Sequence, residues 1–251
     1  MSEELSLGDP MRPRKKKLSR GNNRRRKRTN VFVAFFIDLV VVIGAALVLS
    51  LLIKSFLIRS FFIPSGSMLE TLQIDDRIIV NQLTPALYPI ERGDVVVFKD
   101  PGGWLGPDVS EPTDPLVVSV DWFLSAFGIT APDSKQHLVK RVIGVAGDKV
   151  ICCDADGKIT VNGLPITEPY ISSGQAPSAI EFEIEVPPGS LWVMGDNRGN
   201  SEDSRYHGDL PSKGFVSTEW VVGRAMVISW PFENWTWLDN YPDVFKNIPK
   251  P

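Results

Sequence analysis

The chain has 251 residues, of which 43% are hydrophobic and 23% are charged, and its formal net charge is −3. A chain of this length can hold one membrane span and one globular region that buries its own core. The 2 cysteines are neighbours and the 2 histidines stand apart, which excludes the usual cysteine–histidine zinc motifs. We therefore expect no metal site and no cofactor.

Residues 1–30 carry much of the positive charge. They contain 11 Lys or Arg and 3 Asp or Glu. Residues 31–251 contain 16 Lys or Arg and 27 Asp or Glu. Such basic runs can bind nucleic acid, but beside an apolar segment they also keep their end of the chain in the cytoplasm. Because the apolar segment begins at once, we favour a cytoplasmic tail, disordered on anionic lipid, and expect no nucleic-acid partner.

An apolar stretch follows at residues 31–53, with Asp38 as its single charged residue. About 20 helical residues cross a bilayer, so residues 31–54 are expected to form a transmembrane helix. The stretch is too long for a signal-peptide core and no Ala-x-Ala site follows it directly, so we expect it to be retained. Asp38 is expected to face the interface or the tail, with a functional intramembrane acid as the alternative. Residues 55–251 should then lie outside the cytoplasm.

The outer region contains short runs rich in Val, Ile and aromatic residues, separated by Gly, Pro, Asn and Asp turns. The expected strands are Arg77–Asn81, Asp94–Lys99, His137–Val145, Lys149–Cys152, Ile159–Asn162, Ile180–Val186, Leu191–Met194 and Val221–Ser229. Many short strands without alternating helices predict a mainly β fold. Residues 101–134 interrupt the pattern, and Leu116–Phe127 within them could form a short amphipathic helix.

Cys152 and Cys153 are adjacent and would point to opposite faces of a strand. We expect one buried and one exposed thiol, because a disulfide usually needs α-carbons farther apart than neighbouring residues allow. A strained bridge is the alternative in an oxidising exterior.

The stretch Phe61–Leu72, FFIPSGSMLETL, places Ser65 and Ser67 shortly after the apolar segment. Its Pro and Gly residues prevent the helix from continuing. A serine hydroxyl is a weak nucleophile unless a base removes its proton. His137 and His207 could serve in a Ser-His-Asp triad, but the chain has no G-x-S-x-G elbow.

A lysine is the alternative base, provided that burial lowers its pKa well below the usual value. Lys140 lies in the run LVKRVIG, where Leu138, Lys140 and Val142 share one face of a strand. An inward face would desolvate the amine, whereas the solvated face of an edge strand would leave it in water. The pattern alone favours neither arrangement.

A third cluster is GDNRGNSEDSRY at Gly195–Tyr206, which follows an apolar strand. It could be a charged surface loop. Alternatively, Asn197, Asn200 and Ser201 could supply hydrogen bonds that order a neighbouring site, and an Asp-Arg pair could form within the loop.

Four blocks together resemble the bacterial type I signal peptidases, also called leader peptidases. The blocks are PSGSM after the apolar segment, GDVVVF at Gly93–Phe98, KRVIGVAGDKV at Lys140–Val150 and GDNRGNSEDSRY at Gly195–Tyr206. Their order and spacing match from Phe61 to about Gly223. Two residues depart from the common pattern, since many members have Pro in place of Glu70 and Asp in place of Gly199.

The resemblance implies a mainly β, signal-peptidase-like fold. A single N-terminal transmembrane helix would precede an antiparallel β-sheet catalytic core at residues 55–251. A smaller β domain would be inserted at about residues 151–189.

The resemblance also implies roles for individual residues. Ser67 would be the nucleophile and Lys140 the general base. Ser65 would donate to an oxyanion hole beside the Ser67 N–H, and Ser201 would position the lysine amine. The supporting residues would be Asp203 and Arg205, as an ion pair, together with Asp196 and Asn197. Shallow apolar pockets for small substrate side chains would involve Phe61, Ile63, Pro64, Met68, Leu72, Leu138 and Val139.

The implied activity is that of a membrane-anchored serine endopeptidase with a Ser/Lys dyad. It would remove N-terminal signal peptides from exported preproteins after small residues, in an Ala-x-Ala pattern. Its partners would be secretory preproteins and the phospholipid of the cytoplasmic membrane, with the N-terminus in the cytoplasm. One alternative is a self-cleaving repressor-type peptidase, against which the membrane span argues. The other is a catalytically inactive membrane-anchored binding module, against which the Ser67, Lys140 and Ser201 set argues.

Overall fold

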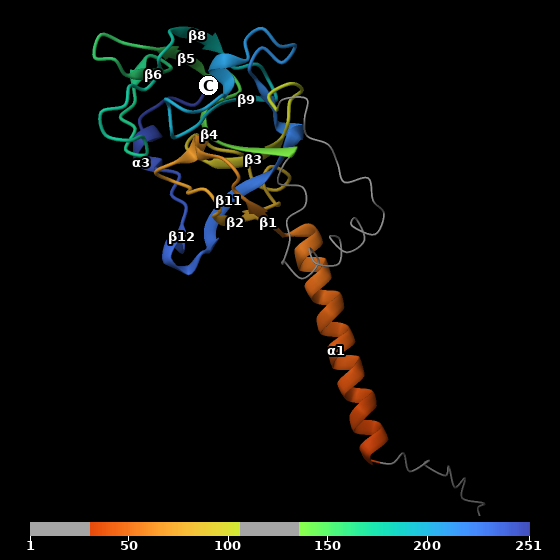
Figure 1. The fold of residues 1–251 in the computed structure, drawn as a ribbon. Coiled ribbons are helices and arrows are strands. Elements are labelled where there is room, and N and C mark those ends of the chain that lie inside the picture. The colour runs from red at the N-terminus through yellow and green to blue at the C-terminus, as the bar shows by residue number, and fades with distance from the viewer. Residues whose placement is uncertain (1–30, 106–135) are drawn as a thin grey trace, which may run out of the picture. The chain divides into compact units, whose positions relative to one another are not determined.

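The structure is a computed structural model, and it describes residues 31–105 and 136–251 (Figure 1). The predicted basic tail and the possible helix at Leu116–Phe127 lie outside these residues. The chain divides into two units, residues 1–45 and residues 46–251.

Helix α1 spans Val31–Phe56. Within it, Phe32–Leu51 is the one segment of the described residues that is long and apolar enough to cross a membrane. Apolar side chains such as Phe35, Val40 and Leu49 are exposed around the helix. A helix that is apolar on all sides is stable only in apolar surroundings, which are a protein core or a bilayer.

The second unit is built on two antiparallel sheets (Figure 1). The main sheet has 8 strands in the order β1-β2-β11-β3-β4-β9-β10, with β12 pairing with β11. These strands are β1 Ile58–Phe62, β2 Arg77–Asn81, β3 Val95–Lys99, β4 His137–Val145, β9 Ser190–Met194, β10 Val216–Ser217, β11 Val221–Trp230 and β12 Thr236–Trp237. The second sheet has 4 strands in the order β7-β6-β5-β8. They are β5 Lys149–Cys152, β6 Ile159–Val161, β7 Leu164–Pro165 and β8 Phe182–Glu185.

The mainly β, antiparallel fold predicted from the sequence is confirmed, and every expected strand is present within one or two residues at its ends. Strand β1 was missed because its apolar residues follow directly on the apolar helix. The two-residue strands β7, β10 and β12 are too short to show an alternating pattern.

Apolar clusters cover both faces of the main sheet, as β3 illustrates. Val95 and Val97 pack in a cluster that contains Met68. Val96 and Phe98 pack in a separate cluster. Successive strand residues point to opposite faces, so a strand buried on both sides has a continuous apolar sequence. Strand β4 lies between β3 and β9 in the sheet, so it is also an interior strand.

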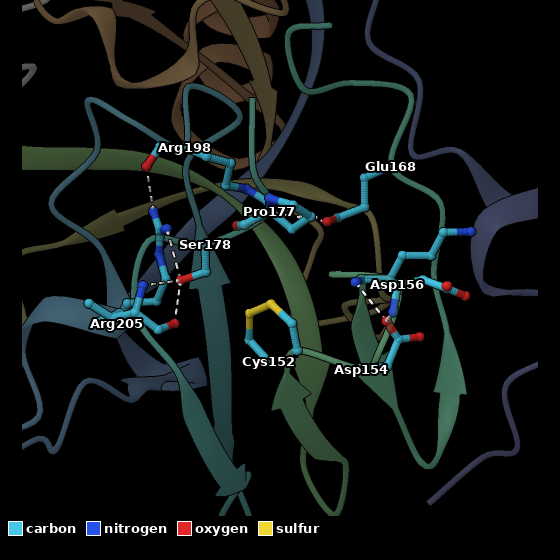
Figure 2. The surroundings of a disulfide bond; sticks show 11 residues. Cys152, Asp154, Asp156, Glu168, Pro177, Ser178, Arg198 and Arg205 are labelled. Atoms are coloured by element: carbon cyan, nitrogen blue, oxygen red, sulfur yellow. Dashed lines mark hydrogen bonds and ion pairs between the residues drawn. A yellow bond between two sulfur atoms is a disulfide. The ribbon is translucent and has the colours of Figure 1, made fainter. Parts of the chain in front are cut away.

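Cys152 and Cys153 form a disulfide at the end of β5 (Figure 2). The expectation of two separate thiols is therefore wrong. The structure has the alternative that the sequence left open, a bridge between the two neighbouring cysteines. The Cys152 side chain is buried in the apolar core that covers the second sheet.

Candidate active site

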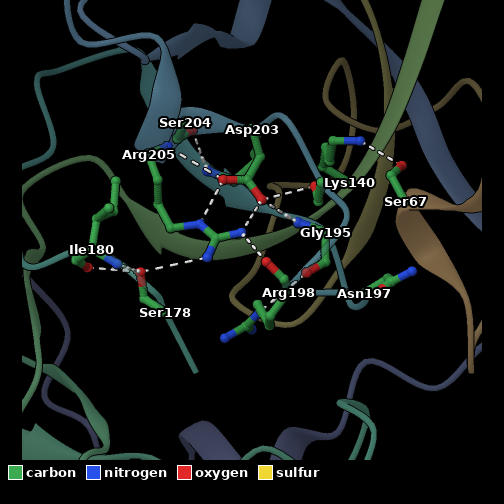
Figure 3. Close-up of polar contacts among 12 residues, drawn as sticks. Ser67, Lys140, Ser178, Ile180, Gly195, Asn197, Arg198, Asp203, Ser204 and Arg205 are labelled. Carbon is green, nitrogen blue, oxygen red and sulfur yellow. Dashed lines mark hydrogen bonds and ion pairs between the residues drawn. The ribbon is translucent and has the colours of Figure 1, made fainter. Parts of the chain in front are cut away.

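Ser67 and Lys140 meet where a short turn contacts the middle of an interior strand (Figure 3). Ser67 lies in the 3₁₀ turn Gly66–Met68, shortly after β1, and Lys140 lies in β4. Lys140 Nζ is 2.6 Å from Ser67 Oγ. At this distance a neutral amine can accept the hydroxyl proton directly.

The Lys140 side chain is buried between neighbouring strands. Val96 pairs with Lys140 across β3 and β4, and Leu138 and Val142 lie on the same face of β4. Lys140 is 3% exposed. Burial penalises the charged amine and lowers the pKa of Lys140 from 10.5 to about 8, although nearby carboxylates partly oppose this shift. Of the two arrangements that the sequence left open, the structure has the inward-facing lysine.

Asp203 organises the polar loop beside the lysine (Figure 3). Its carboxylate accepts hydrogen bonds from the Arg205 guanidinium at 2.8 Å, from the Ser201 hydroxyl at 2.8 Å and from the Gly195 N–H at 2.9 Å. Both side chains of the Asp203–Arg205 pair are fully buried. A buried carboxylate must be paired and hydrogen-bonded in this way to remain charged.

Ser201 contacts this carboxylate rather than the lysine amine. Its hydroxyl donates to Asp203 Oδ2 at 2.8 Å, whereas Lys140 Nζ donates to Ser67. The expected role of Ser201 in positioning the amine stays a prediction.

Gly195 permits the close approach of the polar loop to the nucleophile segment. A β-carbon at this position would lie 2.5 Å from the Ser67 carbonyl oxygen and would collide with the Ser201 hydroxyl. Any larger residue would therefore push Ser67 away from its present position.

Asn197 holds the main chain on both sides of the Ser67 α-carbon. Its backbone N–H donates to the Ser67 carbonyl at 3.1 Å. Its side-chain Nδ2 donates to the Gly66 carbonyl at 2.9 Å.

A second buried ion pair lies on the opposite face of β4. Arg141 Nη2 is 2.7 Å from Asp196 Oδ2, and both side chains are fully buried. Arg141 also donates to the Gly93 carbonyl at 2.7 Å, and its guanidinium lies 4.2 Å from the centre of the Tyr170 ring. These contacts fix the strand that carries the neighbouring Lys140.

Most of the residues expected to line substrate pockets belong to the core. Those that are at most 2% exposed and share one apolar cluster are Phe61, Ile63, Met68 and Leu72. Pro64 is exposed, and Leu138 and Val139 are half-buried. Ser65 is exposed, and its hydroxyl oxygen is 3.5 Å from that of Ser67.

The two histidines make other contacts. The His137 ring packs on Phe61 with 5.1 Å between ring centres, and burial lowers the pKa of His137 to about 4. The His207 ring stacks on Trp104 at 4.2 Å, and its Nδ1 is 2.7 Å from the Asp203 carbonyl oxygen. In the described part of the chain, the basic group within hydrogen-bonding distance of the Ser67 hydroxyl is thus the Lys140 amine.

Residues 168–178 connect β7 to β8 and contact the polar loop at Asn197 and Arg198, which the sequence did not predict. Arg198 forms a buried ion pair with Glu168 and donates to the Pro177 carbonyl at 2.9 Å. Gln175 contacts both Asn197 and Arg198. No local pattern marks Glu168 or Gln175, because their partners lie in a distant block of the sequence.

Comparison with known proteins gives a consistent result. The profile of the family "Signal peptidase, peptidase S26" matches residues 36–230. The chain is 38% identical to the signal peptidase I of Mycobacterium tuberculosis over 218 residues, which cover 79% of this chain and 74% of that protein. It is 38% identical to the probable signal peptidase I of Mycobacterium leprae over 201 residues, which cover 69% of this chain and 68% of that protein. It is 34% identical to the signal peptidase I of Leptolyngbya laminosa over 193 residues, which cover 76% of this chain and 78% of that protein.

We predict that the Lys140 amine loses its proton at about pH 8, because burial disfavours the ammonium form. The full chain in detergent, with ¹⁵N-labelled lysine, should show one amine signal that titrates there and is absent from Lys140→Ala. The exposed Lys149 amine pairs with Glu183, which raises the pKa of Lys149, so it should titrate at higher pH. A Lys140 amine that stays charged up to about pH 10, as a free lysine does, would contradict the prediction.

Proposed function

The chain belongs to the signal peptidase family of hydrolases, peptidase S26, and on that premise we propose that it cleaves signal peptides with a Ser67/Lys140 dyad. The observation that carries this proposal is the 2.6 Å contact between Ser67 Oγ and Lys140 Nζ. The lowered pKa of Lys140 supports it, because a base must be uncharged near the working pH.

The proposed reaction has two stages. Neutral Lys140 accepts the Ser67 proton while the hydroxyl oxygen attacks the scissile carbonyl, and the resulting ammonium then protonates the leaving amine. A water molecule that gives its proton to the same lysine next hydrolyses the acyl-enzyme. Lys140 then returns this proton to Ser67 Oγ as the acyl bond breaks, which restores the neutral amine and the serine hydroxyl.

The Ser65 hydroxyl and the Ser67 N–H are proposed to stabilise the oxyanion. The 3.5 Å separation of the two serine hydroxyls allows Ser65 to reach the oxygen of a carbonyl attacked by Ser67. Loss of one such donor typically lowers the rate by about 10²–10³-fold.

Small residues, as in Ala-x-Ala, are proposed as the preferred residues before the cleavage site. Phe61, Ile63, Met68 and Leu72 are buried so fully that they can form only the floor of a shallow pocket. The half-buried Leu138 and Val139 precede the base and leave some apolar surface for the substrate. A shallow floor suits a methyl group better than a long side chain.

We also propose that α1 anchors the protein in the cytoplasmic membrane with its N-terminus in the cytoplasm. The apolar segment Phe32–Leu51 supports the anchor, and the 11 basic residues before Val31 support the orientation. Only a short stretch of chain separates Ser67 from the end of α1 at Phe56. This short connection would keep the active site close to the membrane surface, where signal peptides emerge. The partners are then secretory preproteins and membrane lipid.

We expect Ser67→Ala and Lys140→Ala each to abolish cleavage of a preprotein, because each change removes one of the two reacting groups. Both variants should fold, as judged by an unchanged circular dichroism spectrum. His137→Ala is the matched control for loss of a basic side chain in β4, and it should retain most of the activity.

Near-full activity of Lys140→Ala together with loss of activity in His137→Ala would reject the dyad. Folded wild-type protein without any cleavage of preproteins would favour the alternative of an inactive binding module.

The topology can be tested by adding protease to intact spheroplasts. Residues after Ser60 should be digested, and a small fragment containing residues 1–53 should be protected, because the basic tail keeps the N-terminus inside. Protection of the large region with loss of the tail would contradict both the orientation and the proposed access to exported substrates.

A further inference from the structure

Gln175 lies in the β7–β8 connection and is held at both polar ends of its side chain. Its Nε2 donates to Asn197 Oδ1 at 3.1 Å, and its Oε1 accepts from the Arg198 N–H at 3.1 Å. Its own N–H donates to the Ser172 carbonyl at 3.0 Å, and the Ser172 hydroxyl donates to Glu70 at 2.9 Å. One turn of the second sheet's connection thus contacts both the polar loop and the nucleophile segment.

The contact with Gln175 determines how the Asn197 amide is oriented. An amide group is planar, with its acceptor oxygen and donor nitrogen on opposite sides. Because the Gln175 N–H faces Oδ1, Asn197 Nδ2 faces the Gly66 carbonyl, at 2.9 Å. A flipped amide would place donor against donor and acceptor against acceptor, so the hydrogen-bond network assigns a single orientation.

The Gly66 carbonyl and the Ser67 N–H belong to the same planar peptide unit. The hydrogen bond from Asn197 to that carbonyl therefore sets the direction of the Ser67 N–H. A second bond, from the Asn197 N–H to the Ser67 carbonyl, restrains the next peptide unit.

We propose that Gln175 is a positioning residue that acts through Asn197 to aim the Ser67 N–H at the oxyanion of the transition state. The inference rests on the proposed function, in which that N–H is an oxyanion donor. Gln175 does not touch the reacting atoms, so its effect should appear in transition-state stabilisation and not in substrate affinity.

The two positions where the sequence departs from the family pattern both contact this turn. Glu70 accepts the Ser172 hydroxyl. A β-carbon at Gly199 would lie 3.2 Å from Gln175 Nε2, so a side chain there would press on the glutamine amide. Glycine at this position leaves room for the Gln175–Asn197 contact.

The test compares Gln175→Glu and Gln175→Ala with wild type, using the full chain in detergent and a signal-peptide substrate. Gln175→Glu preserves size and the acceptor for Arg198 but replaces the donor to Asn197 with an oxygen. We expect kcat to fall about 10-fold in both variants, part of the loss for a whole oxyanion donor, with KM changed less than about 2-fold. Gln73→Ala, which truncates an exposed glutamine, is the matched control and should behave as wild type.

A double-mutant cycle separates positioning from a general loss of stability. Gln175→Ala should add little to the loss caused by Asn197→Ala, because Gln175 acts through that amide. Wild-type kcat in both Gln175 variants, or losses that multiply in the double mutant, would overturn the inference. Activity of Ser67→Ala would instead overturn the proposed function, whereas an inactive Ser67→Ala with normal Gln175 variants rejects the positioning role alone.

Discussion

The burial of the Lys140 amine is the constraint on which the rest of this structure depends. A lysine in water stays protonated at neutral pH and cannot accept a proton from serine. Lys140 lies in the middle of β4, an interior strand, with Val96 opposite, and it is 3% exposed. An interior strand of a sheet with apolar layers on both faces is buried on both sides, as the continuous apolar run VVVF of the neighbouring β3 illustrates.

The carboxylates around the lysine create a second requirement. Asp203 and Asp196 raise the pKa of Lys140, whereas Arg205 lowers it. Each of these two aspartates is paired with its own buried arginine, Asp203 with Arg205 and Asp196 with Arg141. The arginines neutralise charges that would otherwise stabilise the ammonium form of the base. The same carboxylates also order the loop that contacts Ser67. The polar network therefore holds the nucleophile segment in place, and its arginines reduce the effect of the carboxylates on the pKa of Lys140.

The sequence predicted the strands well, because Val-rich runs such as β3 and β4 bounded by Gly and Asp turns leave little ambiguity. It did not predict whether Lys140 faces inward, because that depends on which strands flank β4 in the sheet. The contacts of Arg141 with Asp196 and of Gln175 with Asn197 join distant blocks, and a local pattern cannot reveal such pairs. Local patterns were enough to nominate Ser67 and Lys140, but they left a solvated lysine on an edge strand equally open, and the order and spacing of four motifs implied the pair.

The dependence of kcat/KM on pH tests the role of the buried lysine most directly, because it reports the titration of the catalytic base in the free enzyme. The account predicts a rate that rises through a single limb at about pH 8, the pKa of Lys140, and then reaches a plateau. The measurement should use a substrate without titratable groups near the cleavage site. A rate that keeps rising in proportion to hydroxide up to about pH 10, the range of an exposed lysine, would contradict the account.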